Sequence, residues 1–266
     1  VQYQLNKGML LWSFNFVNSN HGMDVINRAM IQVNSHMMEK GMPELKKSHD
    51  INTYLYYMGR FNRLSVSAIG QFRYNHHPVT DDYYLDEANR KIVKTYSNGG
   101  NAQYYSAIFA LQYKLCKFAN LSGDIRYSHA EVKTIWSKHN NNLTGNLGLN
   151  MFMGDFALKP YLHFGKKSLD EAALVINKTP IDYGMSCSYS RGNLYVELQA
   201  ASPFKKQEKQ YWLDLPIYSY NKSIKDQTAS QYASIKVAYS FDFGRKTQKV
   251  KKDVNKNINS SLLRVE

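Results

Sequence analysis

The chain lacks any long apolar run: no stretch of about eighteen consecutive apolar residues occurs, and the mean hydropathy is −0.52. A helix that spans a membrane needs about 20 predominantly apolar residues, so the sequence predicts no transmembrane helix. Strands escape this test, because a strand with one polar face dilutes the hydropathy of its segment. The low hydropathy therefore leaves a membrane-spanning sheet open.

Cysteine and the common catalytic motifs are also scarce. Cys116 and Cys187 lie far apart, the first at the end of an expected strand and the second inside one, and they form no CxxC pair. We expect buried or lipid-facing thiols rather than a disulfide or a redox site. The sequence contains no GxSxG, P-loop or GxGxxG pattern. It therefore gives no sign of an enzyme, and no cofactor is expected.

Acidic residues are outnumbered, with 21 Asp and Glu against 34 Lys and Arg and a net charge of +13. Such an excess suggests anionic partners, either nucleic acid or lipid phosphates. No helix-turn-helix, zinc-finger or RNP pattern accompanies it, so no nucleic-acid partner is expected. The basic residues crowd the last segment, 244–266, which we expect to be a solvated tail. The chain begins Val-Gln-Tyr, and we expect it to be processed or a piece of something longer.

Aromatic residues are abundant, at 14% with 21 Tyr, and they fall on alternating positions. In the segment 232–243, every second residue from Ala233 to Phe243 is apolar or aromatic, whereas the residues between them are mostly polar. Successive side chains of a strand point to opposite faces. This is the pattern of a strand with lipid on one side and a polar interior on the other. A soluble sandwich strand alternates too, but is usually only about 5–6 residues long.

The same alternation recurs along the chain and predicts about ten strands. Their ranges are 9–17, 51–58, 63–75, 102–115, 121–128, 143–153, 156–164, 181–189, 194–200 and 232–243. The connections alternate between long (18–47, 76–101, 132–140, 165–179 and 204–229) and short (59–62, 117–120, 154–155 and 191–193). Outer-membrane barrels alternate in this way, with short periplasmic turns and longer extracellular loops. The sequence therefore predicts an all-β, antiparallel transmembrane barrel over residues 1–243, with the tail 244–266 in the periplasm.

The last strand fits the terminal pattern by which barrel-assembly machinery recognises its clients. A polar residue is followed two positions later by a small one, and then by two aromatics spaced by one. Lys236, Ala238, Phe241 and Phe243 fill these places. Alanine stands where glycine is usual.

Several segments, in order, resemble the C-terminal part of TonB-dependent outer-membrane receptors of the Bacteroidota type. The family commonly has a Gly-Asn-Pro-x-Leu-x-x-x-x-Ser-His run before a strand, and here Gly41-Met42-Pro43 begins such a run and Ser48-His49 ends it. The other matching segments are 98–101, 189–194, 202–204 and 239–246. Met42 replaces the usual Asn.

The resemblance implies a 22-stranded barrel with an N-terminal plug, of which this chain is the C-terminal arc. The implied partners are outer-membrane lipid and lipopolysaccharide, the barrel-assembly machinery, a surface lipoprotein and the energy-coupling TonB complex. In this family, contact with the TonB complex runs through the plug, which we expect to lie outside this chain. The implied function is uptake of a nutrient ligand. A non-transporting scaffold or adhesin barrel and a soluble all-β binding module stay open as alternatives.

Three groups of residues are candidates for a site. Tyr54, Tyr56, Tyr161 and Tyr195 fall on the polar face and could stack on a sugar or siderophore, but filling space between barrel and plug is the favoured interpretation. His76 and His77 with Asp81 and Asp82 could hold a metal or do acid–base chemistry, but a solvated loop is the favoured interpretation. His21, His36 and His49 around the Met-rich segment 23–42 could bind copper or haem, but Met packing over the barrel mouth is favoured.

Overall fold

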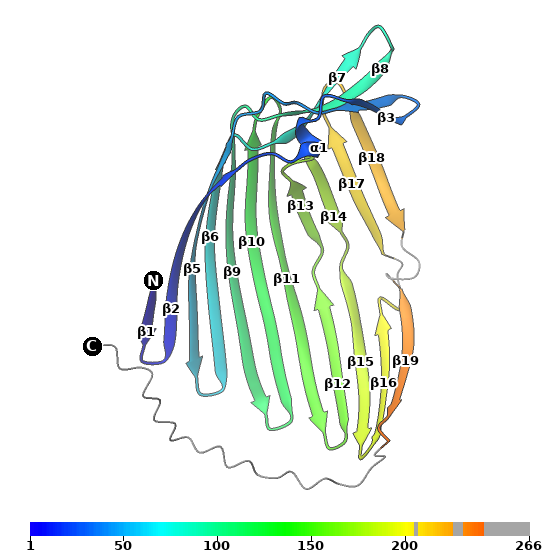
Figure 1. Ribbon diagram of the computed structural model, residues 1–266. Coiled ribbons are helices and arrows are strands. Elements are labelled where there is room, and N and C mark those ends of the chain that lie inside the picture. Colours follow the sequence, from blue (N-terminus) through cyan, green and yellow to red (C-terminus); the bar gives the residue numbers. More distant parts are fainter. Residues whose placement is uncertain (205–206, 226–230, 242–266) are drawn as a thin grey trace, which may run out of the picture.

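The computed structural model describes residues 1–204, 207–225 and 231–241, in which nineteen strands and one short helix occur (Figure 1). The elements are β1 (Gln2–Leu5), β2 (Gly8–Ser19), α1 (Met23–Ile26), β3 (Met30–Asn34), β4 (Met37–Lys40), β5 (Ser48–Phe61), β6 (Leu64–His76), β7 (Thr80–Asp86), β8 (Lys91–Ser97), β9 (Asn101–Cys116), β10 (Ala119–Lys133), β11 (Ser137–Met153), β12 (Phe156–His163), β13 (Lys166–Asp170), β14 (Val175–Thr179), β15 (Asp182–Arg191), β16 (Leu194–Ala201), β17 (Glu208–Asp214), β18 (Ser219–Lys225) and β19 (Tyr232–Tyr239). Among the described residues, no helix is long and apolar enough to cross a membrane.

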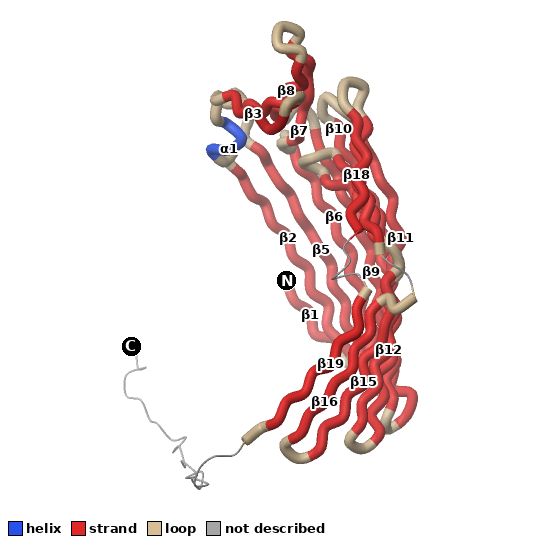
Figure 2. Tube along the Cα trace, turned by 90° about the vertical axis from the view of Figure 1, so that its right-hand side faces the viewer, coloured by secondary structure: helices blue, strands red, loops and turns tan. Residues whose placement is uncertain are grey.

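Eleven strands form one curved antiparallel sheet, in the order β1-β2-β5-β6-β9-β10-β11-β12-β15-β16-β19 (Figures 1 and 2). The prediction of about ten strands missed β1, a four-residue strand that pairs with β2. Over the described residues, β1 and β19 lie at opposite edges of the sheet and do not pair with each other. The sheet is therefore an open arc, and not a closed barrel.

Tight turns join the strands at one end of the large sheet. Asn62, Gly154 and Gly192 have positive φ angles of 52°, 60° and 57°. Positive φ at a turn matches the twist of the flanking strands, and glycine adopts it without strain. These turns lie in three of the four connections that the sequence predicted to be short.

The connections at the other end contain hairpins, whereas the sequence predicted loops. They form two four-stranded sheets, β3-β4-β8-β7 and β13-β14-β17-β18. The predicted long loop 132–140 is wrong, because β10 and β11 continue as a ladder from Ala130↔Asn140 to Lys133↔Ser137. Residues 138–142 are Lys-His-Asn-Asn-Asn, so no apolar alternation marks this part of the ladder in the sequence.

The two faces of the large sheet differ in chemistry. We call the side that carries Phe109, Ile125 and Leu198 the apolar face, and the side that carries Gln112, Asp124 and Gln199 the polar face; the strand registers place each set on one side. Large apolar side chains on the apolar face are exposed, up to 69% for Leu143 and 72% for Ile235. No other described sheet pairs with or covers this face, so the apolar rows do not meet across a dry interior. A soluble sandwich requires such an interior.

The dry core lies at the hairpin end. Two of its buried side chains, Ala102 and Val132, come from the polar face of the large sheet at this end. The others come from the hairpins and their connecting segments: Tyr83, Leu174, Val175, Leu213 and Leu215. The hairpins therefore fold over the upper part of the polar face and bury it. We call the hairpins β7–β8, β13–β14 and β17–β18 the cap.

Candidate functional site: the polar face and its cap

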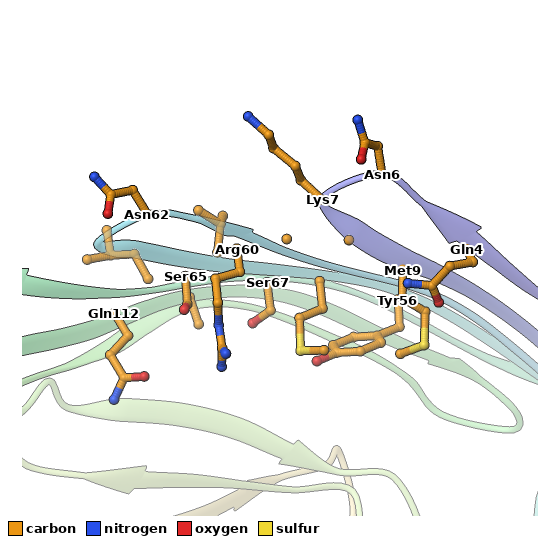
Figure 3. A pocket seen from close by; sticks show the side chains of 16 residues that line it. Gln4, Asn6, Lys7, Met9, Tyr56, Arg60, Asn62, Ser65, Ser67 and Gln112 are labelled. Atoms are coloured by element: carbon orange, nitrogen blue, oxygen red, sulfur yellow. The ribbon is translucent and has the colours of Figure 1, made fainter.

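The polar face contains a hollow of about 940 Å³ at the turn end of β1, β2, β5, β6 and β9. Side chains that line it include Gln4, Tyr56, Arg60, Ser67 and Gln112. Figure 3 shows Arg60 and Gln112 pointing to the same side of the sheet. Because these groups line a wide, open space, water or a ligand can satisfy their hydrogen bonds, and no buried partner is needed.

A second hollow of about 500 Å³ lies on the same face, over β10, β11, β12, β15 and β16. Here Asn146 Nδ2 donates to Asp124 Oδ1 at 2.8 Å, and His163 Nδ1 lies 3.5 Å from Asp182 Oδ2. The Tyr161 and His163 rings are 4.9 Å apart. The surface is rich in donors, acceptors and aromatic faces, which suits a ligand with many hydroxyl groups.

The four tyrosines predicted to line the lumen all fall on the polar face by register. Tyr56 lines the first hollow and Tyr161 lines the second. Lys236 Nζ lies 5.9 Å from the centre of the Tyr195 ring, and Tyr54 is the register partner of Gln71. The structure therefore spreads these residues along the arc instead of gathering them at one site, and their role in binding stays a prediction.

The β13–β14 hairpin lies across the upper polar face. At its base, Asn140 Nδ2 donates to Lys167 O at 2.9 Å and Lys167 N donates to Asn142 Oδ1 at 2.7 Å, so side chains of β11 hold β13. At its tip, Glu171 pairs with Arg73 of β6. Burial raises the pKa of Glu171, and the Arg73 guanidinium opposes this rise. The hairpin thus spans the polar face from β11 to β6.

A second polar cluster joins the β3–β4 hairpin to the β7–β8 hairpin. Lys94 Nζ lies 3.2 Å from Asp81 Oδ2 and 3.3 Å from Glu39 Oε1. Tyr96 OH donates to Glu39 Oε1 at 2.6 Å, which lowers the Glu39 pKa. Burial raises the pKa of Asp81, and burial together with the Glu39 contact raises that of Tyr96 to about 12. Lys94 therefore joins β4 to β7 and β8.

The candidate metal residues in 76–82 have separate partners. His77 Nδ1 lies 3.1 Å from Asn98 O, and the His76 and His77 rings are 3.9 Å apart. Asp81 contacts Lys94, and Asp82 Oδ1 accepts a hydrogen bond from Trp136 Nε1 at 2.9 Å. Within 1–204, 207–225 and 231–241, no group of three or more His, Cys, Asp and Glu side chains could hold a metal ion.

The histidines around the Met-rich segment are also held apart. His21 Nε2 lies 2.6 Å from Lys46 O, and His49 Nδ1 lies 2.6 Å from Asn18 Oδ1. His36 follows β3, where its backbone N–H donates to Asn34 Oδ1. The structure does not bring the three rings to one point.

The predicted assembly residues lie on or just after the edge strand β19. Lys236 pairs in register with Glu197, and Ala238 with Tyr195. Phe241 follows β19, and its ring lies 4.7 Å from that of Tyr239. Phe243 and the tail 244–266 lie outside the described residues.

No family model matches the sequence, and no curated protein matches it at a significant level. Among solved structures, the outer membrane transporter YddB from Escherichia coli is 10% identical with a TM-score of 0.53, and the alignment covers 88% of this chain and 39% of that one. The copper transporter OprC is 11% identical with a TM-score of 0.46, over 71% of this chain and 38% of that one. The chain thus spans less than two fifths of either protein. Its fold is that of an outer-membrane transporter barrel, present as an open arc of eleven strands.

Proposed function

We propose that the chain is the C-terminal part of the barrel of a TonB-dependent outer-membrane receptor that imports a nutrient ligand. The observation that carries the proposal is the sorting of side chains onto an exposed apolar face and a hollowed polar face capped by hairpins. Lipid suits the first, and a water-filled or plugged interior suits the second. A transport role also suits the likeness to transporters better than a catalytic one.

The proposed orientation places the tight turns and the tail 244–266 in the periplasm and the cap outside the cell. The free edges of β1 and β19 then pair with further strands of a 22-stranded barrel, because unpaired backbone groups are costly in lipid. A plug outside this chain carries the contact with the TonB complex. Lipopolysaccharide, the barrel-assembly machinery and a surface lipoprotein are the other proposed partners.

A labelling experiment tests the membrane placement. In full-length protein with Cys116→Ser and Cys187→Ser, single cysteines are placed at Ser234 and Ile235, neighbours on opposite faces of β19. A water-soluble maleimide should label Ser234→Cys in intact outer membranes, and a lipid-soluble reagent should label Ile235→Cys. Equal labelling of the Ser234→Cys and Ile235→Cys proteins by the water-soluble reagent would contradict the proposal that this face of the sheet contacts lipid.

A second experiment tests uptake. Cells with and without the gene, and with and without the TonB complex, are given radiolabelled ferric siderophores and fluorescent oligosaccharides. The proposal expects uptake of at least one probe that needs both the gene and the complex. Uptake that needs the gene but survives loss of the complex would contradict TonB dependence and leave a passive channel.

One observation favours a scaffold or adhesin as the second candidate. The β7–β8 hairpin projects beyond the rest of the cap (Figure 1), and near its tip Tyr84 is 40% and Leu85 is 55% exposed. Exposed aromatic and aliphatic side chains on a projecting hairpin suit a protein partner. Loss of surface binding with unchanged uptake in Tyr84→Ser/Leu85→Ser protein would support this role.

A further inference from the structure

Several basic side chains on the polar face have no ionic partner. The strand registers place them on the side of the sheet that carries Gln112, Asp124 and Gln199. We call them the basic set: Arg60 of β5, Lys114 of β9, Arg126 of β10 and Lys159 of β12. All are exposed, and none forms a salt bridge with another described residue. Because arginine and lysine stay protonated at neutral pH, the set offers permanent positive charge and N–H donors.

The acidic side chains over the same part of the face already have partners. Asp124 accepts a hydrogen bond from an asparagine of β11. Ser202 Oγ donates to Asp182 Oδ1 at 2.9 Å, and Glu197 is the register partner of Lys236. These carboxylates are therefore engaged, whereas the basic set is not. The face below the cap is prepared for a negatively charged group from outside the sheet.

The basic set extends along the strands as well as across them. Lys114 pairs in register with Asn120 of β10, and Asn120 pairs with Asn150 of β11. The antiparallel register of β11 and β12 puts Lys159 beside Asn150, so two lysines flank two amide side chains at one level. Arg126 lies six positions along β10 from Asn120, which is about 20 Å nearer the cap. The charges therefore form a series that runs down the polar face.

The open space over these charges is continuous. Arg60 lines the first hollow, at the turn end, and Lys159 lines the second (Figure 3 shows the first). Ala110 and Leu111 of β9 line both hollows, so the two adjoin there. One extended ligand can therefore contact basic side chains in both hollows.

Rows of lysine and arginine in a membrane pore favour anions, because the positive charges replace the hydration of the passing ion. We propose that the ligand imported through this barrel carries several negative charges and is held along the polar face by the basic set. The proposal rests on the proposed function, which places this face inside the barrel, and it names the class of nutrient. The attraction acts over a distance that salt limits to about 10 Å at 0.1 M, so each charge of the ligand is held by its nearest basic side chain.

The first test measures the charge of the polar face without a ligand. Full-length protein with Cys116→Ser and Cys187→Ser receives one cysteine in the second hollow, Ser122→Cys. It is reacted with an anionic and with a cationic methanethiosulfonate reagent. The ratio of the anionic to the cationic rate should exceed that of free cysteine, and Arg126→Gln/Lys159→Gln should lower it at least about threefold. High salt should reduce the difference.

Two variants serve as controls for this ratio. Lys133→Gln removes a positive charge from the opposite face of β10, and Arg126→Lys/Lys159→Arg keeps both charges, so both should match the wild type. An unchanged ratio in Arg126→Gln/Lys159→Gln would overturn the proposal. A Ser122→Cys side chain that reacts with neither reagent would also overturn it, because a plug would then cover the basic set in place of a ligand.

The second test determines the charge of the ligand. Cells receive probes in pairs: sulfated and unsulfated maltohexaose, oligogalacturonate and its methyl ester, and an anionic ferric catecholate and an uncharged ferric hydroxamate. The anionic member of at least one pair should enter faster, in a manner that needs the gene and the TonB complex, and Arg126→Gln/Lys159→Gln should slow its uptake. Such uptake confined to the uncharged members would overturn the inference and leave the proposed function standing. Labelling of Ser234→Cys and Ile235→Cys reports separately on the membrane placement.

Discussion

The two ends of the polar face are held by different forces. Under the cap, Val132 is 0%, Leu174 is 1% and Leu213 is 1% exposed, so this end has a dry core of its own. At the turn end, the same face is open around Arg60 and Gln112, and the apolar side chains point outward. The cap is therefore stabilised by its own packing, whereas the large sheet, which we call the wall, depends on lipid and on further strands.

The largest effect should come from opening the core of the cap. Leu213→Ala in β17 removes a fully buried side chain and should cost about 2–5 kcal/mol of cap stability. The matched change Leu143→Ala removes a side chain that is 69% exposed on the apolar face and should leave the cap unchanged. Hydrogen exchange of β13–β14 and β17–β18 in detergent measures both. Faster exchange in both variants would mean that cap and wall are one cooperative unit.

A smaller effect should come from releasing the tip of the β13–β14 hairpin. Arg73→Ala leaves the half-buried Glu171 without its ion pair, which should cost about 1–3 kcal/mol of hairpin docking. Trypsin should then cleave at Lys166 or Lys167 faster than in wild type. Arg60→Ala, on the same face but at the turn end, is the control. No change in cleavage with Arg73→Ala would show that the Asn140 and Asn142 contacts hold the hairpin alone.

Acidification should stabilise the cap slightly. The pKa of Glu171 is raised in the folded protein, so the folded state binds the proton more tightly than the unfolded state, and stability increases as pH falls. The gain should appear between neutral pH and the ordinary value of 4.5. Proteolysis of the hairpin across this range measures it, and Glu171→Gln should flatten the slope. A steeper slope in that variant would assign the titration elsewhere.

The smallest effect on stability should come from the projecting hairpin. Tyr84→Ser/Leu85→Ser changes two exposed side chains, and the free energy of unfolding should shift by less than about 0.5 kcal/mol per site. Thermal unfolding in detergent measures this shift. A large loss of stability would mean that this hairpin packs against the rest of the cap more than its exposure indicates.

The wall could be predicted from the sequence because lipid and lumen impose a period of two over many residues. The alternation found every strand of the large sheet except β1, where Gln2–Leu5 is too short to show a period. It also placed Tyr54, Tyr56, Tyr161 and Tyr195 on one face, because side chains two positions apart in a strand lie on the same side of the sheet.

The cap could not be predicted in the same way. β13 reads Lys-Lys-Ser-Leu-Asp and β18 Ser-Tyr-Asn-Lys-Ser-Ile-Lys, short polar segments without a clear apolar face. The Arg73–Glu171 pair joins residues 98 positions apart and depends on how the hairpin folds back. No local pattern carries that information.

β13 is attached to β11 through side chains and not through strand pairing. Lys167 is held at its backbone by two asparagine side chains, and β11 keeps its own ladder with β10 and β12 beneath them. Removing the hairpin from this face would break these bonds, the Arg73–Glu171 ion pair and part of the buried packing of the cap. It would break no backbone hydrogen bond between strands of the large sheet. The docking of this hairpin and the strand pairing of the large sheet therefore rest on separate sets of bonds.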